Sequence, residues 1–439
     1  MASSPRSPRG GREPLARHGI LPSRHPLVTM LAMLGVVLGV VGVSATGLAA
    51  YSVWDAAQSI SANAVVLDDD KPLPPSLGAI EGGVNLLIVG SDSCEGQDVA
   101  LFPRCANDDS PGERNDVTML VHISDEPRRV TVVSFPRDML VPIPACPRED
   151  GDGFYSAMSL QMLNASYMYG GLACTVATIE ELTGEEIHFA GAIRWTGVIN
   201  MSDAIGGVDV CVAGDISDVH TGLNLTAGTH TLKGVEALQF LRIRHGIGDG
   251  SDLGRISNQQ QFMSSMVRKL QSEAVLANPG VLFNLATTAI NQVQQGQLVL
   301  SSGLTNPTLM VQIAMAVKDV PYEDIVFVQY PTRYSSGDGA SRVVPVTDAA
   351  DALFAALREN RPLTLTGEAS QGYGVEVTGE AVKPDPTPGA TEAPADGAEP
   401  GDAAAGGAGE APVAEERVEL PSEIAGQTAA QTTCTVPER

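Results

Sequence analysis

The segment Ser134-Phe-Pro-Arg-Asp138 places an arginine and an aspartate directly after an expected strand. Residues 129–134 form an apolar run rich in β-branched side chains, which is typical of a buried strand. Pro136 has no N–H to donate, so the ladder of hydrogen bonds ends there. Because open α/β sheets bind ligands beyond their strand ends, Arg137 and Asp138 are candidates to hold a ligand there.

Two further aspartates lie at expected strand ends. Asp92 follows the apolar run 84–90, and Asp116 immediately precedes the apolar run 117–123. Carboxylate oxygens are the ligands that Mg²⁺ prefers, and Mg²⁺ fills the rest of its shell with water and phosphate oxygens. The pair therefore predicts a site for Mg²⁺ or Mn²⁺. The alternative is that both aspartates are ordinary turn or capping residues.

Arginines also gather at the ends of expected elements in this otherwise acidic chain. Guanidinium groups bind phosphate oxygens in a bidentate manner and stay charged at every relevant pH. Asp252, Arg255 and Gln259 are spaced so that they share one face of a helix. The pattern predicts a pyrophosphate site built from Arg114, Arg137, Arg242, Arg244, Arg255 and Gln259. The alternative is a set of surface ion pairs, each of little energetic value.

Strand and helix patterns alternate along the part of the chain that must position these residues. Continuous apolar runs predict strands at residues 84–90, 117–123, 129–134, 208–212 and 325–330. The turn at 124–128 makes the second and third strands an antiparallel pair. Helical periodicity covers residues 157–169, 175–182, 196–205, 233–241, 254–270, 281–292, 307–317 and 346–359. The interleaving predicts an α/β sandwich with a mixed sheet.

The beginning of the chain predicts a membrane anchor. Residues 1–26 hold five arginines and one acidic residue, and residues 27–50 form an uncharged apolar run that is long enough to span a bilayer. We therefore expect a basic cytoplasmic tail at 1–26, a transmembrane helix at 27–50, a linker at 51–83 and an extracytoplasmic remainder. A cleaved signal peptide is the alternative, and it exports the same part of the chain.

The formal net charge of −25 argues against general nucleic-acid binding, because such binding needs a basic surface. The acidity is concentrated toward the end of the chain. Residues 367–439 are rich in Ala, Gly, Pro and Glu. Such a segment buries too little apolar surface to offset its ordering entropy, so we expect a disordered tail.

Six cysteines fit an oxidising compartment. Cys94 and Cys105 bracket a short polar loop, and Cys146 and Cys174 lie on either side of an expected helix. The pairing cannot be deduced from sequence, and Cys434 in the tail is the candidate for a free thiol. No Cys-x-x-Cys spacing occurs, which argues against zinc.

Several motifs occur together in a specific order. They are Gly90-Ser-Asp92, Arg114-Asn-Asp116, Ser134-Phe-Pro-Arg-Asp138, Leu163-Asn-Ala165 with Gly170-Gly171, Asp203-Ala-Ile-Gly-Gly-Val208, Arg242-Ile-Arg-His245 and Gly250-Ser-Asp-Leu-Gly-Arg255 with Gln259. In this order and spacing they resemble the LytR-CpsA-Psr family of bacterial cell-wall enzymes, and the local details are most similar to actinobacterial members. The resemblance covers about residues 84–270.

The resemblance implies an α/β/α sandwich with a central mixed sheet, a catalytic domain at 84–366 and a long apolar groove for a polyprenyl lipid. It implies a phosphotransferase that attaches a glycopolymer from undecaprenyl or decaprenyl pyrophosphate to a peptidoglycan hydroxyl. Asp92 and Asp116 would hold Mg²⁺, and the arginines with Gln259 would bind the pyrophosphate. Two departures stand out. Asn258 stands where the family often has another arginine, and Asn115 where it often has serine.

Arg137 and Asp138 are the candidate catalytic residues. Asp138 or one of the metal-binding aspartates is expected to deprotonate or orient the attacking hydroxyl, and the alternative for Asp138 is a brace that fixes the rotamer of Arg137. Two other functions fit the same residues. A pyrophosphatase would use water in place of the sugar hydroxyl, and a non-catalytic envelope module would only bind the lipid.

Methionines in the helices expected at 157–169 and 254–270 suit an irregular apolar ligand, although ordinary core packing is the simpler interpretation.

Overall fold

The computed structural model describes residues 64–67, 83–107, 112–148, 151–272, 275, 278–336, 342–381 and 416–438. The predicted cytoplasmic tail, the predicted transmembrane helix and nearly all of the predicted linker lie outside these ranges. Among the residues described, no helix is both long and apolar enough to cross a membrane. Everything below concerns the unit formed by residues 57–439.

A seven-stranded sheet forms the centre of the described part, with the order β13-β8-β1-β2-β3-β14-β20. Its strands are β1 (Val84–Ser91), β2 (Asn115–Ile123), β3 (Val130–Phe135), β8 (Phe189–Ile193), β13 (Leu298–Leu300), β14 (Ile325–Gln329) and β20 (Gly426–Thr428). β2 pairs antiparallel with β1 and with β3, whereas β1 pairs parallel with β8 and β3 with β14. The predicted mixed sheet and the predicted antiparallel pair are confirmed.

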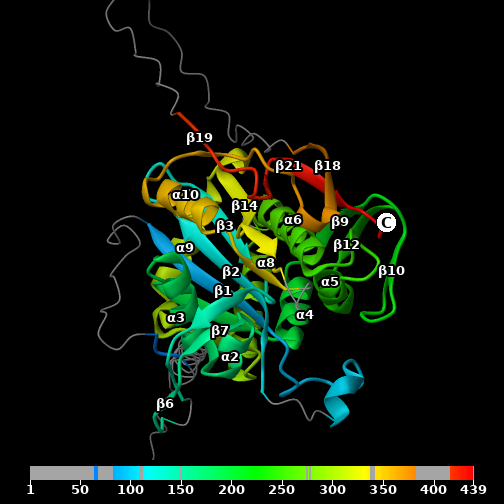
Figure 1. Ribbon diagram of the computed structural model, residues 1–439. Coiled ribbons are helices and arrows are strands. Elements are labelled where there is room, and N and C mark those ends of the chain that lie inside the picture. Colours follow the sequence, from blue (N-terminus) through cyan, green and yellow to red (C-terminus); the bar gives the residue numbers. More distant parts are fainter. Residues whose placement is uncertain are drawn as a thin grey trace, which may run out of the picture. The chain divides into compact units, whose positions relative to one another are not determined.

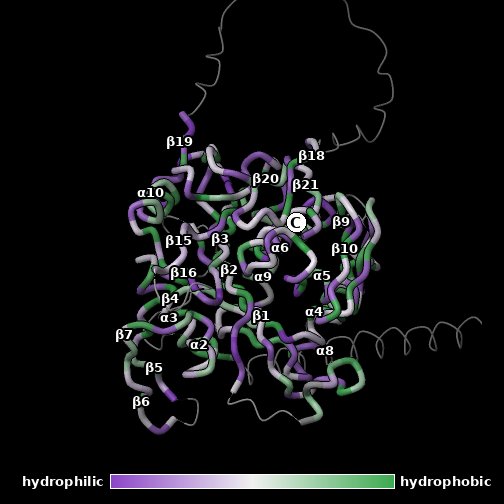
Figure 2. Tube along the Cα trace, turned by 45° about the vertical axis from the view of Figure 1, so that its right-hand side comes forward, coloured by the Kyte–Doolittle hydropathy of each residue, from purple (hydrophilic) through white to green (hydrophobic). Residues whose placement is uncertain are grey.

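Helices cover both faces of this sheet (Figure 1). Leu87 and Val89 of β1 pack in a core with α3 (Gly171–Thr183) and α10 (Thr347–Arg358). Ile88, between them, points to the opposite core, where α6 (Asp252–Gln271) and α9 (Pro307–Lys318) lie. Successive side chains of a strand face opposite sides, so the buried strands are apolar on both. The result is an α/β/α sandwich, and Figure 2 shows the hydropathy along its trace.

A smaller sheet with the order β12-β9-β21-β18 lies beside α6. Its strands are β9 (Val208–Val212), β12 (Gly228–Leu232), β18 (Val375–Glu380) and β21 (Gln431–Thr435). The helices α4 (Trp195–Ala204), α5 (Gly234–Arg242) and α8 (Pro279–Gln294) complete this side of the molecule, where α4 contacts both α5 and α8.

Short elements connect these parts. They are α2 (Ala165–Met168) and the strands β4 (Leu140–Ile143), β5 (Cys146–Pro147), β6 (Phe154–Tyr155), β7 (Met158–Met162), β10 (Ile216–Asp218), β11 (Leu223–Leu225), β15 (Thr332–Tyr334), β16 (Val343–Pro345), β17 (Leu363–Thr364) and β19 (Val418–Glu419). Single 3₁₀ turns occur at Pro103–Asn107, Ser302–Thr305, Tyr322–Asp324 and Gln371–Tyr373.

The helix predicted at residues 157–169 is wrong. Met158–Met162 is the strand β7, which pairs antiparallel with β4, and only Ala165–Met168 is helical. Met158, Leu160 and Met162 alternate with period two, so the same apolar residues also fit a strand. The other predicted helices are confirmed, with ends that differ by a few residues.

The prediction of a disordered tail is wrong for residues 367–381 and 416–438. β20 extends the central sheet and β21 joins β9, while Leu420, Ile424 and Ala429 are almost fully buried. These few apolar residues are enough because they join cores that the rest of the chain already forms. Residues 382–415 lie outside the described ranges.

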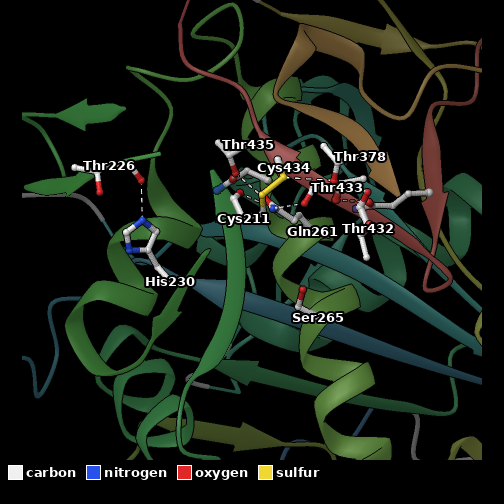
Figure 3. Close-up of a disulfide and its surroundings, with 12 residues drawn as sticks. Cys211, Thr226, His230, Gln261, Ser265, Thr378, Thr432, Thr433, Cys434 and Thr435 are labelled. Carbon is white, nitrogen blue, oxygen red and sulfur yellow. Dashed lines mark hydrogen bonds between the residues drawn. A yellow bond between two sulfur atoms is a disulfide. The ribbon is translucent and has the colours of Figure 1, made fainter. Parts of the chain in front are cut away.

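A disulfide joins Cys211 of β9 to Cys434 of β21 (Figure 3). Gln261 of α6 donates hydrogen bonds to the carbonyl oxygens of Cys211 at 2.8 Å and Thr433 at 2.7 Å. The hydroxyl of Thr435 donates to Oε1 of Gln261 at 2.6 Å. The prediction of a free Cys434 is therefore wrong, and the C-terminal strand is fixed to the helix that carries Arg255.

The remaining cysteines form the disulfides Cys94–Cys105 and Cys146–Cys174. The first closes the short polar loop after β1, and the second ties β5 to α3. All six cysteines of the sequence are therefore disulfide-bonded.

Candidate active site

Arg137 lies at the centre of a group of carboxylates beyond the end of β3. Its Nη1 is 2.6 Å from Oδ1 of Asp116, and its Nε is 3.4 Å from Oδ1 of Asp252 and 3.7 Å from Oδ2 of Asp138. These carboxylates hold the guanidinium in one orientation and raise the pKa of Arg137 against the opposing effect of burial. Arg137 is thus a fixed positive charge, and its side chain remains 23% exposed.

The first turns of α6 bring Arg255 to the same place. Nη2 of Arg255 is 2.5 Å from Oδ1 of Asp252, and it donates a hydrogen bond to the carbonyl oxygen of Asp116 at 3.1 Å. Ser251 caps the helix, because its hydroxyl accepts from the backbone N–H of Gly254 at 3.3 Å. An aspartate in the first turn is favourable toward the positive end of the helix dipole.

Asp252 is the residue that the predicted site set omits. Its side chain is 11% exposed and contacts both Arg137 and Arg255. Its Oδ2 is buried and lacks a hydrogen-bond partner among the described residues. The spacing of Asp252 and Arg255 was visible in sequence, but the approach of α6 to the end of β3 was not.

Asp116 owes its position to a β-bulge between β1 and β2. Ser91 pairs with Asn115 and Gly90 pairs with Val117, so Asp116 is the extra residue on β2. Bulges of this kind redirect a side chain and are frequent beside active sites. Here the bulge lets Asp116 line the cavity described below.

The surroundings shift the pKa values of two carboxylates in opposite directions. Burial raises the pKa of Asp116, but Arg255 and Arg137 outweigh it, so the net shift is below the ordinary value and the group is ionised. Burial and the neighbouring Asp252 raise the pKa of Asp138, and the opposing effect of Arg137 is smaller. Asp138 is therefore the better proton acceptor of the two.

A cavity of about 390 Å³ opens beside this charged group. Asp116, Arg242, Arg255 and Gln259 lie at its polar end. Most of the remaining wall is apolar and comes from α4, α5, α6 and α8 together with β1, β2 and β8. Its side chains are those of Ile88, Val117, Met119, Ile193, Trp195, Val198, Met201, Ile205, Leu238, Leu241, Phe262, Met263, Met266, Leu270 and Leu285. The cavity is thus charged at one end and apolar at the other. Met263 and Met266 line the cavity and also pack against the neighbouring cores.

Arg242 and Arg244 lie on either side of the end of α5. Arg242 is the last residue of α5, lines the cavity and places its guanidinium 4.2 Å above the ring of Trp195. Its positive charge contributes to the low pKa of Asp116. Arg244 is close enough to Asp138 to oppose the rise in the pKa of Asp138. The two arginines therefore act on different carboxylates.

Gln259 and Asn258 connect α6 to its neighbours. Gln259 donates to the carbonyl oxygen of Leu241 at 2.9 Å, which fixes the end of α5 just before Arg242. Asn258 is fully buried and donates to the carbonyl oxygen of Phe240 at 2.7 Å. The asparagine that replaces the family's frequent arginine is therefore part of the packing between α5 and α6.

Asp92 and Arg114 lie together at the ends of β1 and β2. The backbone N–H of Arg114 donates to Oδ1 of Asp92 at 2.9 Å, and the backbone N–H of Asp92 donates to the carbonyl oxygen of Arg114 at 3.0 Å. Neither residue lines the cavity, although Arg114 is only two residues before Asp116.

Asp92 and Asp116 are the carboxylates predicted to hold a metal ion. Among the described residues, no group of three or more His, Cys, Asp or Glu side chains is arranged to hold a metal ion. Asp116 is ionised, and it lies near the strand end that carries Asp92. Hard oxygen donors of this kind fit Mg²⁺ or Mn²⁺, which complete their shells with water and phosphate oxygens.

A family model matches residues 51–359 and is described as the LytR_cpsA_psr family. The match covers more than half of the chain. The chain belongs to the LytR_cpsA_psr family. The resemblance based on the ordered motifs is thereby confirmed, and the family match includes every predicted site residue.

Two relatives of this LytR_cpsA_psr protein have names that refer to the cell wall. The chain is 31% identical over 228 residues to "Probable cell wall biosynthesis protein LcpB" of Corynebacterium glutamicum, covering 51% of each chain. It is 25% identical over 246 residues to "Polyisoprenyl-teichoic acid--peptidoglycan teichoic acid transferase TagU" of Enterococcus faecalis, covering 56% of this chain and 72% of that protein. The chain spans about half the length of LcpB.

One solved structure similar to this LytR_cpsA_psr protein is a "LytR-Csp2A-Psr enzyme from Actinomyces oris". It has 25% sequence identity and a TM-score of 0.44, and the match covers 63% of this chain and 90% of that one.

Proposed function

We propose that this protein is a phosphotransferase that attaches a glycopolymer from a polyprenyl-pyrophosphate carrier to a hydroxyl of peptidoglycan. The observation that supports this most is one cavity that is lined by Asp116, Arg242 and Arg255 at one end and by apolar side chains at the other. A lipid pyrophosphate has the same division, with anionic oxygens at one end and a hydrocarbon chain at the other.

The arginines supply charge stabilisation. In phosphoryl transfer, negative charge on the phosphate oxygens is stabilised by groups oriented before the reaction begins. Arg137 and Arg255 are oriented by Asp116 and Asp252. Arg242, stacked on Trp195, adds a third positive charge, and Arg114, Arg244 and Gln259 complete the proposed pyrophosphate site.

A divalent cation is proposed at Asp116 and Asp92. When bound, Mg²⁺ or Mn²⁺ neutralises charge on the pyrophosphate. Arg255 and Arg137 lower the pKa of Asp116, which keeps its carboxylate ionised and able to bind the cation.

Asp138 is the proposed base. The acceptor hydroxyl attacks the phosphorus atom next to the glycan, its proton passes to Asp138, and the bond from that phosphorus to the oxygen of the lipid phosphate breaks. Polyprenyl phosphate leaves, and the glycan becomes linked to peptidoglycan through a phosphodiester. The raised pKa of Asp138 supports this role, since a base works best when its pKa approaches the operating pH.

The proposed location is the cell membrane, with a single span at residues 27–50, a cytoplasmic N-terminus and an extracytoplasmic catalytic domain. Three disulfides support an oxidising compartment outside the cytoplasm. The proposed partners are the lipid-linked glycopolymer, peptidoglycan and membrane lipid, and the charge of −25 argues against nucleic acid.

A lipid-linked glycan given with and without peptidoglycan tests this proposal. Glycan bound to peptidoglycan, formed only when both are present, is the expected result. Release of free glycan phosphate at the same rate without peptidoglycan would instead identify a pyrophosphatase. No turnover under either condition, together with normal function of an Arg137→Ala variant in cells, would identify a non-catalytic lipid-binding module.

A further inference from the structure

Most of α8 carries side chains that the described part of the chain does not bury, and large apolar ones are among them. No residue in the range 281–291 is buried. Phe283 is 72% exposed and Leu282 is 40% exposed. A surface helix normally turns its apolar face toward the core and its charged face toward water. We call the exposed face of residues 281–291, which includes Leu282 and Phe283, the α8 surface.

The α8 surface belongs to an unusually long uncharged stretch. No Asp, Glu, Lys, Arg or His occurs between Glu273 and Lys318. Charged residues make up 18% of the whole chain, and its net charge is −25. A helix that faces water normally carries charged side chains on that face. Exposure to water alone therefore does not explain the uncharged composition of α8.

Helix α8 also contributes to the apolar end of the cavity. Leu285 of α8 lines the cavity together with Leu270 and Met266 of α6. The cavity measures about 390 Å³, a size that suits a drug-sized molecule. A decaprenyl chain is much larger, so part of its tail must remain outside. Because Leu285 lines the cavity, α8 is one of the elements that such a tail would meet.

We propose that the α8 surface docks on the lipid bilayer, so that the polyprenyl tail passes along α8 between the membrane and the cavity. This rests on the proposed function, because the lipid carrier is what connects the two. The charge distribution favours a membrane over other partners. Anionic lipid headgroups repel a chain of net charge −25, so its uncharged apolar surface is the part that can approach a bilayer.

Fluorescence quenching in vesicles tests the contact directly. All native cysteines are disulfide-bonded, so a thiol introduced by Phe283→Cys in the full chain can be labelled alone with a polarity-sensitive dye. Val219→Cys is the matched control, because Val219 is also apolar and is 89% exposed. In vesicles of phosphatidylglycerol and phosphatidylethanolamine, we expect lipids with nitroxide on the acyl chain to quench the dye at 283 several-fold more than at 219.

Equal quenching at the two positions would overturn the proposal. A concentration-dependent blue shift of the dye at 283 without lipid would also overturn it, since that result identifies a second copy of the chain as the occupant.

Transfer assays provide a functional test. We expect Phe283→Asp to lower transfer from a decaprenyl donor in vesicles by about tenfold, as expected when the burial of a large apolar side chain is lost. Transfer from a water-soluble donor with a short prenyl chain should not change. Unchanged transfer from both donors would contradict the proposal. If the wild type uses neither donor, the proposed function fails, and the quenching result alone decides the docking.

Discussion

Replacing Asp252 with asparagine should shift the pH dependence of transfer. Asp252 raises the pKa of Asp138 by the repulsion between two neighbouring carboxylates. An asparagine keeps the shape and removes the charge, so the pKa of Asp138 falls. If transfer needs ionised Asp138, activity declines as the pH falls through that pKa, and the acid limb of the profile moves to lower pH in the variant.

The size of the shift follows from the exposure of the two side chains. Asp252 is 11% exposed and Asp138 is 24% exposed. Solvent screens a pair of this kind, so we expect a shift of about one pH unit or less. Maximal transfer should also fall by about tenfold, because Arg137 and Arg255 lose a shared positioning partner.

The folded state should survive this substitution. Breaking a fully buried ion pair costs ~3–5 kcal/mol. Arg137 keeps its contact with Asp116, and Arg255 keeps its hydrogen bond to the carbonyl oxygen of Asp116. We therefore expect a loss of only about 1–2 kcal/mol in the free energy of unfolding.

The assay is the rate of transfer to peptidoglycan between pH 4 and pH 8. Asp348→Asn is the control, since Asp348 also lies in the first turn of a helix, α10, but is exposed and outside the cavity wall. An acid limb that stays at the wild-type pH in Asp252→Asn would refute the assignment of Asp138 as a base sensitive to Asp252.

Three other predictions follow from the same structure. Asp138→Asn should lower transfer by at least about 100-fold while lipid binding is retained; full activity would leave Asp138 as a brace for Arg137. Met263→Trp should narrow the cavity and weaken binding of a long-chain donor more than of a short-chain one, measured as separate Kd values. His122 is buried, and burial lowers its pKa to about 4; the unfolded chain therefore binds the extra proton between about pH 6.5 and pH 4, and stability is lost as pH falls through this window. His122→Gln should remove up to about 3 kcal/mol of that loss, measured by denaturant titrations at several pH values. A free energy of unfolding that depends on pH as steeply as in the wild type would contradict the prediction.

Local sequence patterns were sufficient to predict the centre of the fold. The strands at 84–90, 117–123 and 129–134 were visible because buried strands need continuous apolar, β-branched runs. The turn between the second and third strands determined their pairing. Residues 157–169 could not be assigned in this way, because the same apolar positions satisfy both a strand and a helix.

Long-range contacts explain what sequence did not predict. The segment 416–438 is poor in large apolar residues, and its order depends on joining sheets and a disulfide made with Cys211, far away in the chain. Asp252 was visible as part of a helix face, but its contact with Arg137 requires α6 to reach the end of β3. The bulge that turns Asp116 into the cavity likewise depends on the register between two strands.

A structure of the full chain with a polyprenyl pyrophosphate and Mg²⁺ tests the central claim most directly. We predict that the pyrophosphate oxygens lie within hydrogen-bonding distance of Arg137, Arg242 and Arg255, and that the first isoprene units occupy the cavity beside Met263 and Leu285. A pyrophosphate bound away from these arginines, or a lipid chain that binds outside this cavity, would contradict the account.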